Sequence, residues 1–277
     1  MANKTLINGV ATDEISILDR GLQYGDGLFE TIAVKNGSLL CWDEHLKRLE
    51  QGCKRLNISF PEKTLLKEEA SSLINAIDHG VIKIIITRGQ GGRGYALPEK
   101  TNSTRIISLY PWPEHPKQKY SNGINVRVCD YRYAKNTSLA GIKHLNRLEQ
   151  ILARSEWTDD AYAEGIVLDQ EDNVIEGTMS NVFCVTNNIL YTPNLTECGV
   201  EGIVRNTIIA LASELNINLE IKKLSLEAIK NADEVFVCNS IIGVWPVKAI
   251  DEKSFLVGEK TQQIKKALQE RDCISSC

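Results

Sequence analysis

The sequence predicts an α+β fold built from two domains. Segments with the β-branched or alternating pattern of strands are grouped apart from segments whose apolar residues recur at helical spacing, which is typical of α+β proteins. A composition shift over residues 111–123 holds three of the seven prolines, and proline favours extended chain because it fixes φ and removes a hydrogen-bond donor. We therefore expect a smaller N-terminal domain over 1–112, a linker over 113–120 and a larger C-terminal domain over 121–277.

In the N-terminal domain, two predicted strands form a hairpin because Asn36-Gly37 between them is a strong turn signal. Asp43 is expected to cap the next helix, in which apolar residues recur at helical spacing from Leu46 to Leu56. Two further strands bracket a glycine-rich segment at 88–95. The predicted strands are 28–34, 38–41, 81–87 and 104–109, and a second helix is predicted near 62–77.

In the C-terminal domain, the same patterns predict strands around two helices. One helix is expected over about 144–157, and another over 203–214 after the glycines of 199–202. The predicted strands are 124–129, 165–169, 173–185 and 234–238, with a turn at 170–173 between the second and third.

The composition excludes several classes of protein. The 277 residues carry a net charge of −4, with 43% hydrophobic and 25% charged residues, as in ordinary globular proteins. A net negative charge argues against nucleic-acid binding, which is typical of basic domains with clustered Lys and Arg. No apolar run approaches the ~20 residues of a membrane span. The first residues also lack the apolar core of a signal peptide. We expect a soluble, cytoplasmic protein with neither a nucleic acid nor a membrane as partner.

The cysteines and histidines do not form a metal-binding pattern. Eight cysteines and four histidines are scattered singly, and no CxxC pair occurs. We expect no metal and interpret the cysteines as small core hydrophobes in a reducing compartment.

One lysine stands in a distinctive setting. Lys143 lies between a glycine turn and a predicted helix, in the string AGIKHLNR at 140–147. Taken alone, such a lysine is typical of a solvated surface. Four other strings accompany it in order along the chain: DRGLQYGDGLFET at 19–31, HLKRL at 45–49, VIEGTMSNVF at 174–183 and GIVR at 202–205.

This ordered set resembles the fold-type IV pyridoxal-phosphate enzymes, the group of branched-chain and D-amino acid aminotransferases and aminodeoxychorismate lyase. The resemblance runs over about residues 5–250. It implies a two-domain fold of the D-amino acid aminotransferase kind, pyridoxal 5'-phosphate as cofactor and a homodimer.

The resemblance also implies roles for the cofactor-binding residues. Lys143 matches the Schiff-base lysine, and an amine on a flexible stem suits that bond and a later proton transfer. Glu176 matches the acid beside the pyridine nitrogen, where a carboxylate favours the protonated ring. Arg48 matches the phosphate-binding arginine, since a guanidinium fork suits a phosphate dianion. Each of these residues, taken singly, is also compatible with an ordinary surface position.

Further phosphate contacts are expected from two other segments. Ile203 and Val204 open a predicted helix, so their backbone N–H groups can point at the phosphate. Asn239 and Ser240 match a second phosphate contact. The threonine-rich run of the aminotransferases is replaced here by Ile241-Ile242.

Two residues are assigned to the substrate and the reaction. Arg93 falls where family members hold a substrate carboxylate, and the glycines around it suit a flexible basic loop. A nucleotide-binding loop is the alternative, although no GK[ST] follows. Thr31 matches a position where the lyases have threonine and the branched-chain aminotransferases have glycine. Its hydroxyl can relay a proton to or from Lys143, or it can be an ordinary β-branched strand residue.

Within the group, the strings at 88–95 and 140–147 are most similar to those of aminodeoxychorismate lyases. The implied reaction converts 4-amino-4-deoxychorismate, a small molecule, to 4-aminobenzoate and pyruvate, a step toward folate. The alternative is a D-amino acid or branched-chain aminotransferase of the same fold. A non-catalytic cofactor- or metabolite-binding protein is disfavoured by the intact set of Lys143, Glu176 and Arg48.

Overall fold

The computed structural model describes residues 4–75, 77–99 and 102–274, and two compact units divide the chain. The first unit comprises the chain up to Pro113 together with Ile142–Asn146, and the second comprises Glu114–Gly141 and the chain from Arg147 onward. Lys143, expected in the C-terminal domain, therefore packs with the first unit. The physical reason is that its backbone pairs with a strand of that unit.

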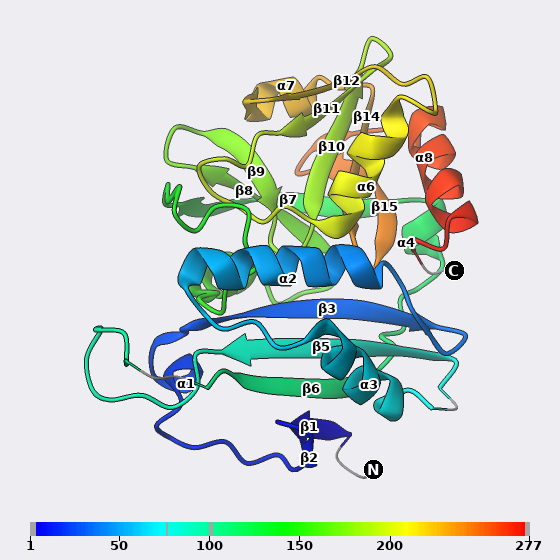
Figure 1. The fold of residues 1–277 in the computed structure, drawn as a ribbon. Helices are drawn as coiled ribbons and strands as arrows, with labels where there is room; N and C mark the ends of the chain where they lie inside the picture. The colour runs from blue at the N-terminus through cyan, green and yellow to red at the C-terminus, as the bar shows by residue number, and fades with distance from the viewer. Residues whose placement is uncertain (1–3, 76, 100–101, 275–277) are drawn as a thin grey trace. The chain divides into compact units, whose positions relative to one another are not determined.

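In its described residues, the first unit is a six-stranded antiparallel sheet with three helices (Figure 1). Its strands are β1 (Thr5–Ile7), β2 (Val10–Ala11), β3 (Gly27–Lys35), β4 (Ser38–Leu39), β5 (His79–Thr87) and β6 (Thr104–Pro111), and its helices are α1 (Arg20–Tyr24), α2 (Trp42–Leu56) and α3 (Lys63–Leu73). The strand order is β2-β1-β6-β5-β3-β4. Side chains alternate between the two faces of each strand, and Ile32, Ile82 and Ile84 are fully buried on the face that α2 covers.

Helix α2 begins earlier than the sequence analysis predicted. Asp43 is not its cap, because the helix starts at Trp42 and Cys41 is the N-cap, in the left-handed region at φ 48°. The tight β3–β4 hairpin leads into the helix within two residues, which leaves no room for an extended capping residue at Asp43. Asp43 instead lies in the first turn with Glu44, where the positive end of the helix dipole stabilises negative charge.

As far as residue 274, where the described chain ends, the second unit is a ten-stranded mixed sheet with five helices (Figure 1). Its strands are β7 (Ile124–Tyr133), β8 (Glu164–Asp169), β9 (Asn173–Gly177), β10 (Asn181–Thr186), β11 (Ile189–Pro193), β12 (Leu219–Lys222), β13 (Leu224–Ser225), β14 (Glu234–Asn239), β15 (Gly243–Ile250) and β16 (Lys253–Ser254). Its helices are α4 (Gln118–Ser121), α5 (Leu148–Arg154), α6 (Ile203–Ala212), α7 (Leu226–Lys230) and α8 (Glu259–Glu270). Helices α6 and α8 pack on β14, where the rings of Phe183 and Phe236 stack with centroids 5.1 Å apart.

Two predicted elements of this unit differ in the structure. The helix expected over about 144–157 is shortened to α5, because the segment before Arg147 pairs with β3 through a bridge at His144. The single strand expected over 173–185 is split into β9 and β10 by a turn at 177–180.

A buried carboxylate accounts for this turn. Glu164, on the neighbouring strand β8, accepts hydrogen bonds from Thr178 N (3.0 Å), Thr178 Oγ1 (2.5 Å) and Ser180 Oγ (2.7 Å). Burial raises the pKa of this carboxyl group, and the surrounding donors oppose that effect.

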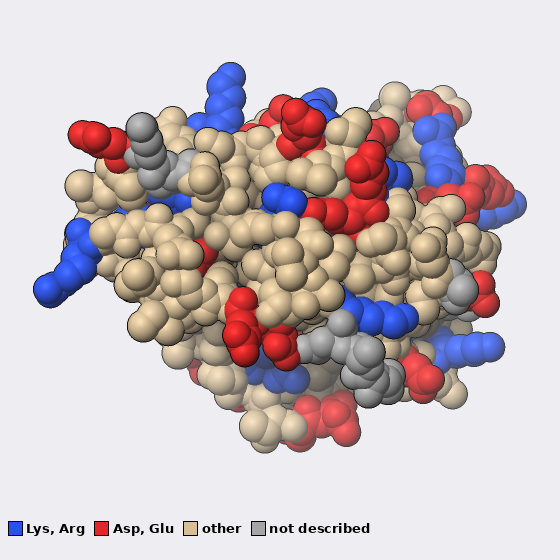
Figure 2. Space-filling model, turned by 60° about the horizontal axis from the view of Figure 1, so that its bottom comes forward, with Lys and Arg blue, Asp and Glu red and all other residues tan. Residues whose placement is uncertain are grey.

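No helix in the described ranges is both long and apolar enough to cross a membrane. Lys and Arg side chains are interspersed with Asp and Glu among the described residues of the face drawn in Figure 2.

Candidate active site

The predicted Schiff-base lysine lies beside strand β3. Phe29 N donates to Lys143 O, and Leu145 N donates to Gly27 O, both at 2.9 Å, so the lysine segment extends the sheet at this edge. Leu28 and His144 form the antiparallel bridge between them. This register places the Lys143 side chain on the same face as Phe29, and Lys143 Nζ is 4.5 Å from the centre of that ring.

Thr31 shares this face. It follows Phe29 by two residues on β3, so both side chains leave the strand in the same direction. Phe29, Thr31 and Lys143 are all half-buried. The structure thus gathers the predicted base and the predicted proton relay on one face of the first unit.

Arg48 contacts the other face of β3, opposite the face that carries Phe29 and Thr31. Arg48 Nε donates to Glu30 Oε1 at 2.8 Å and Arg48 Nη2 donates to Glu30 Oε2 at 2.5 Å, which is a bidentate pair that orients the guanidinium plane. His45, one turn before Arg48 on α2, lies with Nδ1 2.6 Å from Glu30 Oε2. Sequence reasoning did not single out Glu30, although it stands within the string at 19–31.

The electrostatics of this cluster favour a charged Glu30. Burial by itself raises the pKa of Glu30, but Arg48 and His45 outweigh it and hold the pKa at about 2. Burial lowers the pKa of His45, and the positive charges of Arg48 and Lys143 act in the same direction against the attraction of Glu30. Arg48 is therefore fixed by a permanent carboxylate partner.

The glycine-rich loop that carries Arg93 is held at Gly94 by helix α1. Arg20 Nη1 donates to Gly94 O at 2.9 Å, and Gly94 N donates to Tyr24 Oη at 3.2 Å. Gly94 has φ 87°, a conformation that glycine adopts without strain. The Arg93 side chain is exposed and makes no hydrogen bond or ion pair with the described residues, so no such contact joins it to Lys143 or Thr31.

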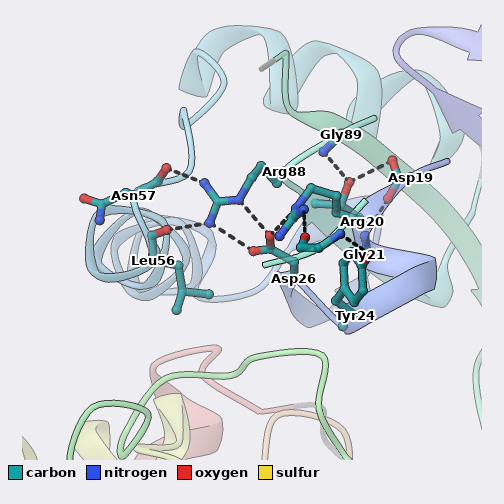
Figure 3. Close-up of polar contacts among 12 residues, drawn as sticks. Asp19, Arg20, Gly21, Tyr24, Asp26, Leu56, Asn57, Arg88 and Gly89 are labelled. Atoms are coloured by element: carbon teal, nitrogen blue, oxygen red, sulfur yellow. Dashed lines mark hydrogen bonds and ion pairs between the residues drawn. The ribbon is translucent and has the colours of Figure 1, made fainter. Parts of the chain in front are cut away.

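Asp26 connects this loop to the beginning of β3 (Figure 3). Its Oδ2 accepts from Arg20 Nε at 2.9 Å and from Arg88 Nε at 2.7 Å. Arg88 also donates to the backbone carbonyls of Leu56 and Asn57, at 2.7 Å each, at the end of α2. One carboxylate thus ties together the entry to β3, the loop and the helix that carries Arg48.

The predicted pyridine partner, Glu176, is a buried carboxylate in the second unit. It lies on β9, and its Oε2 accepts from Val200 N at 2.9 Å and from Asn181 Nδ2 at 3.4 Å. Asn181 also donates to Val200 O at 2.9 Å, and its Oδ1 accepts from Gly202 N at 3.1 Å. Asn181 therefore links the acid to the start of α6. We did not predict this role, although Asn181 belongs to the string at 174–183.

The start of helix α6 leaves backbone donors available. Its N-cap, Gly202, has extended geometry and no side chain that accepts a hydrogen bond. The N–H groups of Ile203 and Val204 have no acceptor within the helix because they belong to its first turn. Both side chains are buried in the core, so only their backbone can contact a ligand. Such a helix end suits a phosphate group.

Asn239 shapes the turn that carries Ser240. Asn239 Oδ1 accepts from the backbone N–H groups of Ile241 and Ile242, at 2.8 Å each, and Asn239 Nδ2 donates to Met179 O at 2.9 Å. The side chain of Asn239 is therefore used within the protein, and Ser240 is held in the turn that this side chain forms.

The site residues thus fall into two groups, with Lys143, Thr31, Arg48 and Arg93 in the first unit and Glu176, Ile203, Val204, Asn239 and Ser240 in the second. A model of the class IV aminotransferase family matches residues 27–250, a range that includes all nine of them. The chain belongs to the class IV aminotransferases.

Members of this family with different activities are similar to nearly the whole chain. Aminodeoxychorismate lyase of Vibrio harveyi is 34% identical over 93% of this chain and 97% of its own. D-alanine aminotransferase of Bacillus licheniformis is 31% identical over 96% of each chain.

Solved structures of class IV aminotransferases confirm the predicted fold. 4-Amino-4-deoxychorismate lyase from Pseudomonas aeruginosa has a TM-score of 0.92 at 43% identity, covering 96% of this chain and 98% of its own. The branched-chain amino acid aminotransferase of Escherichia coli has a TM-score of 0.87 at 27% identity, covering 98% and 94%. The fold-type IV architecture expected from the sequence is the one these enzymes share.

Proposed function

We propose that this protein is an aminodeoxychorismate lyase that converts 4-amino-4-deoxychorismate to 4-aminobenzoate and pyruvate with pyridoxal 5'-phosphate as cofactor. The observation that carries the proposal is the similarity to the Pseudomonas aeruginosa lyase, at 43% identity over 96% of the chain, against 27% for the Escherichia coli aminotransferase. The glycine-rich loop at 88–95 and the position of Thr31 beside Lys143 support the lyase over an aminotransferase.

The residues present fit this cofactor. Glu176 offers a buried carboxylate for a protonated pyridine nitrogen, and its orientation is set by Val200 N and Asn181. In the second unit, the uncapped start of α6 offers the N–H groups of Ile203 and Val204 to a phosphate, and Ser240 adds a hydroxyl. In the first unit, Arg48 offers a guanidinium group that suits a phosphate. Lys143 offers a half-buried amine for the cofactor's carbonyl carbon.

The chain's own groups account for the proton transfers. The cofactor supplies an electron sink that stabilises the negative charge left when a proton is removed. Lys143 Nζ takes the proton from the ring carbon that bears the amine of the substrate. Thr31 Oγ1 or Lys143 Nζ then returns a proton to the departing enolpyruvyl group, which completes pyruvate as the ring becomes aromatic. Positioned proton transfer of this kind typically contributes ~10²–10⁴-fold in rate.

Two incubations separate the lyase from its alternative. The purified protein supplied with 4-amino-4-deoxychorismate should form 4-aminobenzoate and pyruvate in equal amounts, and it should turn over D-alanine plus 2-oxoglutarate far more slowly. The alternative, a D-amino acid or branched-chain aminotransferase, is favoured by the 31% identity to D-alanine aminotransferase. Brisk transamination without 4-aminobenzoate would establish the alternative.

Replacing Arg48 by alanine should weaken cofactor binding first. A charge-assisted phosphate contact contributes ~1.5–3 kcal/mol, so the dissociation constant of the cofactor should rise by about 10- to 100-fold in equilibrium dialysis. Lys47→Ala is the matched control, because Lys47 is the exposed neighbour of Arg48 on α2. An unchanged dissociation constant in Arg48→Ala would show that Arg48 makes no phosphate contact.

Replacing Thr31 by valine should slow the lyase reaction selectively. Valine keeps the branched shape that suits a strand but lacks the hydroxyl, so 4-aminobenzoate formation should fall by about 10²-fold if Thr31 relays the proton. Thr31→Ser restores the hydroxyl and should recover most of the rate. Equal rates in the wild type and Thr31→Val would leave Thr31 with a structural role only.

We also propose that the protein is a homodimer. Helix α5 exposes three apolar side chains at helical spacing, with exposed fractions of 72% for Leu148, 60% for Ile151 and 51% for Leu152. A contiguous apolar helix face is typical of a protein contact, and a second copy is the usual partner in closed oligomers. Sedimentation equilibrium should give twice the chain mass of 30.9 kDa, and a monomer at micromolar concentration would contradict this proposal.

A further inference from the structure

A row of polar side chains crosses the sheet of the first unit on the face that carries Lys143. Lys83 on β5 lies directly opposite Thr31 on β3, and on its other side it lies opposite Ser108 on β6. Ser108 in turn lies opposite Thr5 on β1, whose hydroxyl donates to Ser108 Oγ at 3.0 Å. Directly opposed residues point to the same face, so the row places an ammonium group beside Thr31.

Lys83 and Lys143 approach the same aromatic ring. Lys83 Nζ is 5.4 Å from the centre of the Phe29 ring, and Lys143 Nζ is 4.5 Å from it. Because Lys83 and Thr31 are directly opposed, their Cβ atoms are about 5 Å apart. The Lys83 ammonium therefore belongs to the same cluster as the two residues to which we assign the proton transfers.

Lys83 differs in its partners from the buried and half-buried arginines of this unit. Arg88 pairs with Asp26 and Arg105 pairs with Glu69, each within 2.7 Å. Within the described residues, the ring of Phe29 is the contact that Lys83 Nζ makes, and no carboxylate lies at ion-pair distance from it. A half-buried ammonium loses part of its hydration free energy, and the attraction to one aromatic ring compensates for little of that cost. This arrangement suits a cation whose carboxylate partner arrives with a ligand.

We propose that Lys83 is a substrate-binding residue that receives the carboxylate of the enolpyruvyl side chain of 4-amino-4-deoxychorismate. The inference rests on the proposed function. The substrate has two carboxylates, and with Lys83 at one of them Arg93 is left for the other, on the ring. The enolpyruvyl carboxylate is bonded to the carbon next to the one that must be protonated, so the cation that holds it has to lie beside the proton donor. Lys83 meets this condition because it is directly opposite Thr31.

The test compares two ligands that differ in this carboxylate. Chorismate carries both the ring and the enolpyruvyl carboxylates, whereas 4-aminobenzoate carries only the ring carboxylate. In Lys83→Met, which keeps a long unbranched side chain without charge, the dissociation constant of chorismate measured by calorimetry on the holoenzyme should rise about tenfold or more. The dissociation constant of 4-aminobenzoate should change less than about twofold. Arg93→Ala should weaken the binding of both ligands.

Two variants control for charge and for folding. Lys83→Arg keeps the positive charge and should retain most of the chorismate affinity, and Lys83→Gln should reproduce the loss seen with methionine. The KM for 4-amino-4-deoxychorismate should rise in parallel with the chorismate dissociation constant, while the absorption spectrum of the bound cofactor stays unchanged.

The outcomes separate this inference from the function on which it rests. If the unaltered protein forms 4-aminobenzoate but chorismate binds Lys83→Met as tightly as the wild type, Lys83 does not hold this carboxylate. Equal weakening of chorismate and 4-aminobenzoate would also overturn the assignment, because it would indicate a general change in the site. If the unaltered protein forms no 4-aminobenzoate, the proposed function fails, and the inference fails with it.

Discussion

Lys143→Ala should abolish 4-aminobenzoate formation while leaving the sheet of the first unit intact. The Lys143 side chain contacts the ring of Phe29, whereas the hydrogen bond between its carbonyl and Phe29 N involves only the backbone and survives the substitution. Loss of the amine removes both the proposed covalent attachment point and the proposed base. The rate should therefore fall by at least the ~10²–10⁴-fold that proton transfer alone contributes.

Chemical labelling gives this prediction a second readout. Borohydride reduction of the yellow holoenzyme should leave the cofactor bound to the peptide that contains Lys143, and Lys143→Ala should take up no label. Lys47→Ala, on the exposed side of α2, should label and react as the wild type does. Recovery of the label on another lysine would refute the assignment.

Glu176→Gln should lower turnover much more than cofactor affinity. The amide keeps an oxygen that can accept from Val200 N, so the local structure is expected to persist. It carries no negative charge, however, and no longer favours a protonated pyridine nitrogen. A hydrogen bond to a charged group contributes ~1.5–3 kcal/mol, so kcat should fall by about 10- to 100-fold.

The matched control for this substitution is Glu220→Gln, which removes one charge from an exposed position on β12. It should change neither kcat nor the dissociation constant of the cofactor. The cofactor's absorption spectrum should shift in Glu176→Gln alone. Wild-type turnover in Glu176→Gln would mean that the acid beside the pyridine nitrogen is another residue.

The response of the rate to excess cofactor distinguishes the roles of Arg48 and Glu176. Arg48 is proposed to act on binding, so its loss should be recovered by excess cofactor. Glu176 is proposed to act on the electron sink, so added cofactor should not restore its rate. Measuring kcat at saturating cofactor in both variants therefore separates binding from chemistry.

The sequence by itself determined the family and most of the strands. The ordered strings around Lys143 and Glu176 are local, and a match of several strings in order needs no knowledge of packing. The Asn36-Gly37 signal and the β-branched run of β5 identified their elements because the turn chemistry and the alternation of side chains are encoded within a few neighbouring residues.

Only the tertiary structure decided where the extended segments pair. Local periodicity predicts a helix from about residue 144, yet the segment at Lys143–Leu145 pairs with the edge of β3 through backbone hydrogen bonds. The break between β9 and β10 likewise depends on Glu164, which is distant in sequence and belongs to none of the sequence motifs.

For the same reason, sequence patterns could not identify the residues that contact and orient the predicted site residues. Glu30 orients Arg48, Asn181 joins Glu176 to the start of α6, and Lys83 stands beside Thr31 through strand register. Each of these relations joins residues that are distant in the chain, and a one-residue shift of register would turn Lys83 to the other face of the sheet. Sequence predicts which residues carry the chemistry, because the ordered strings that contain them resemble those of the family. Packing and hydrogen bonding in three dimensions determine which neighbours orient them.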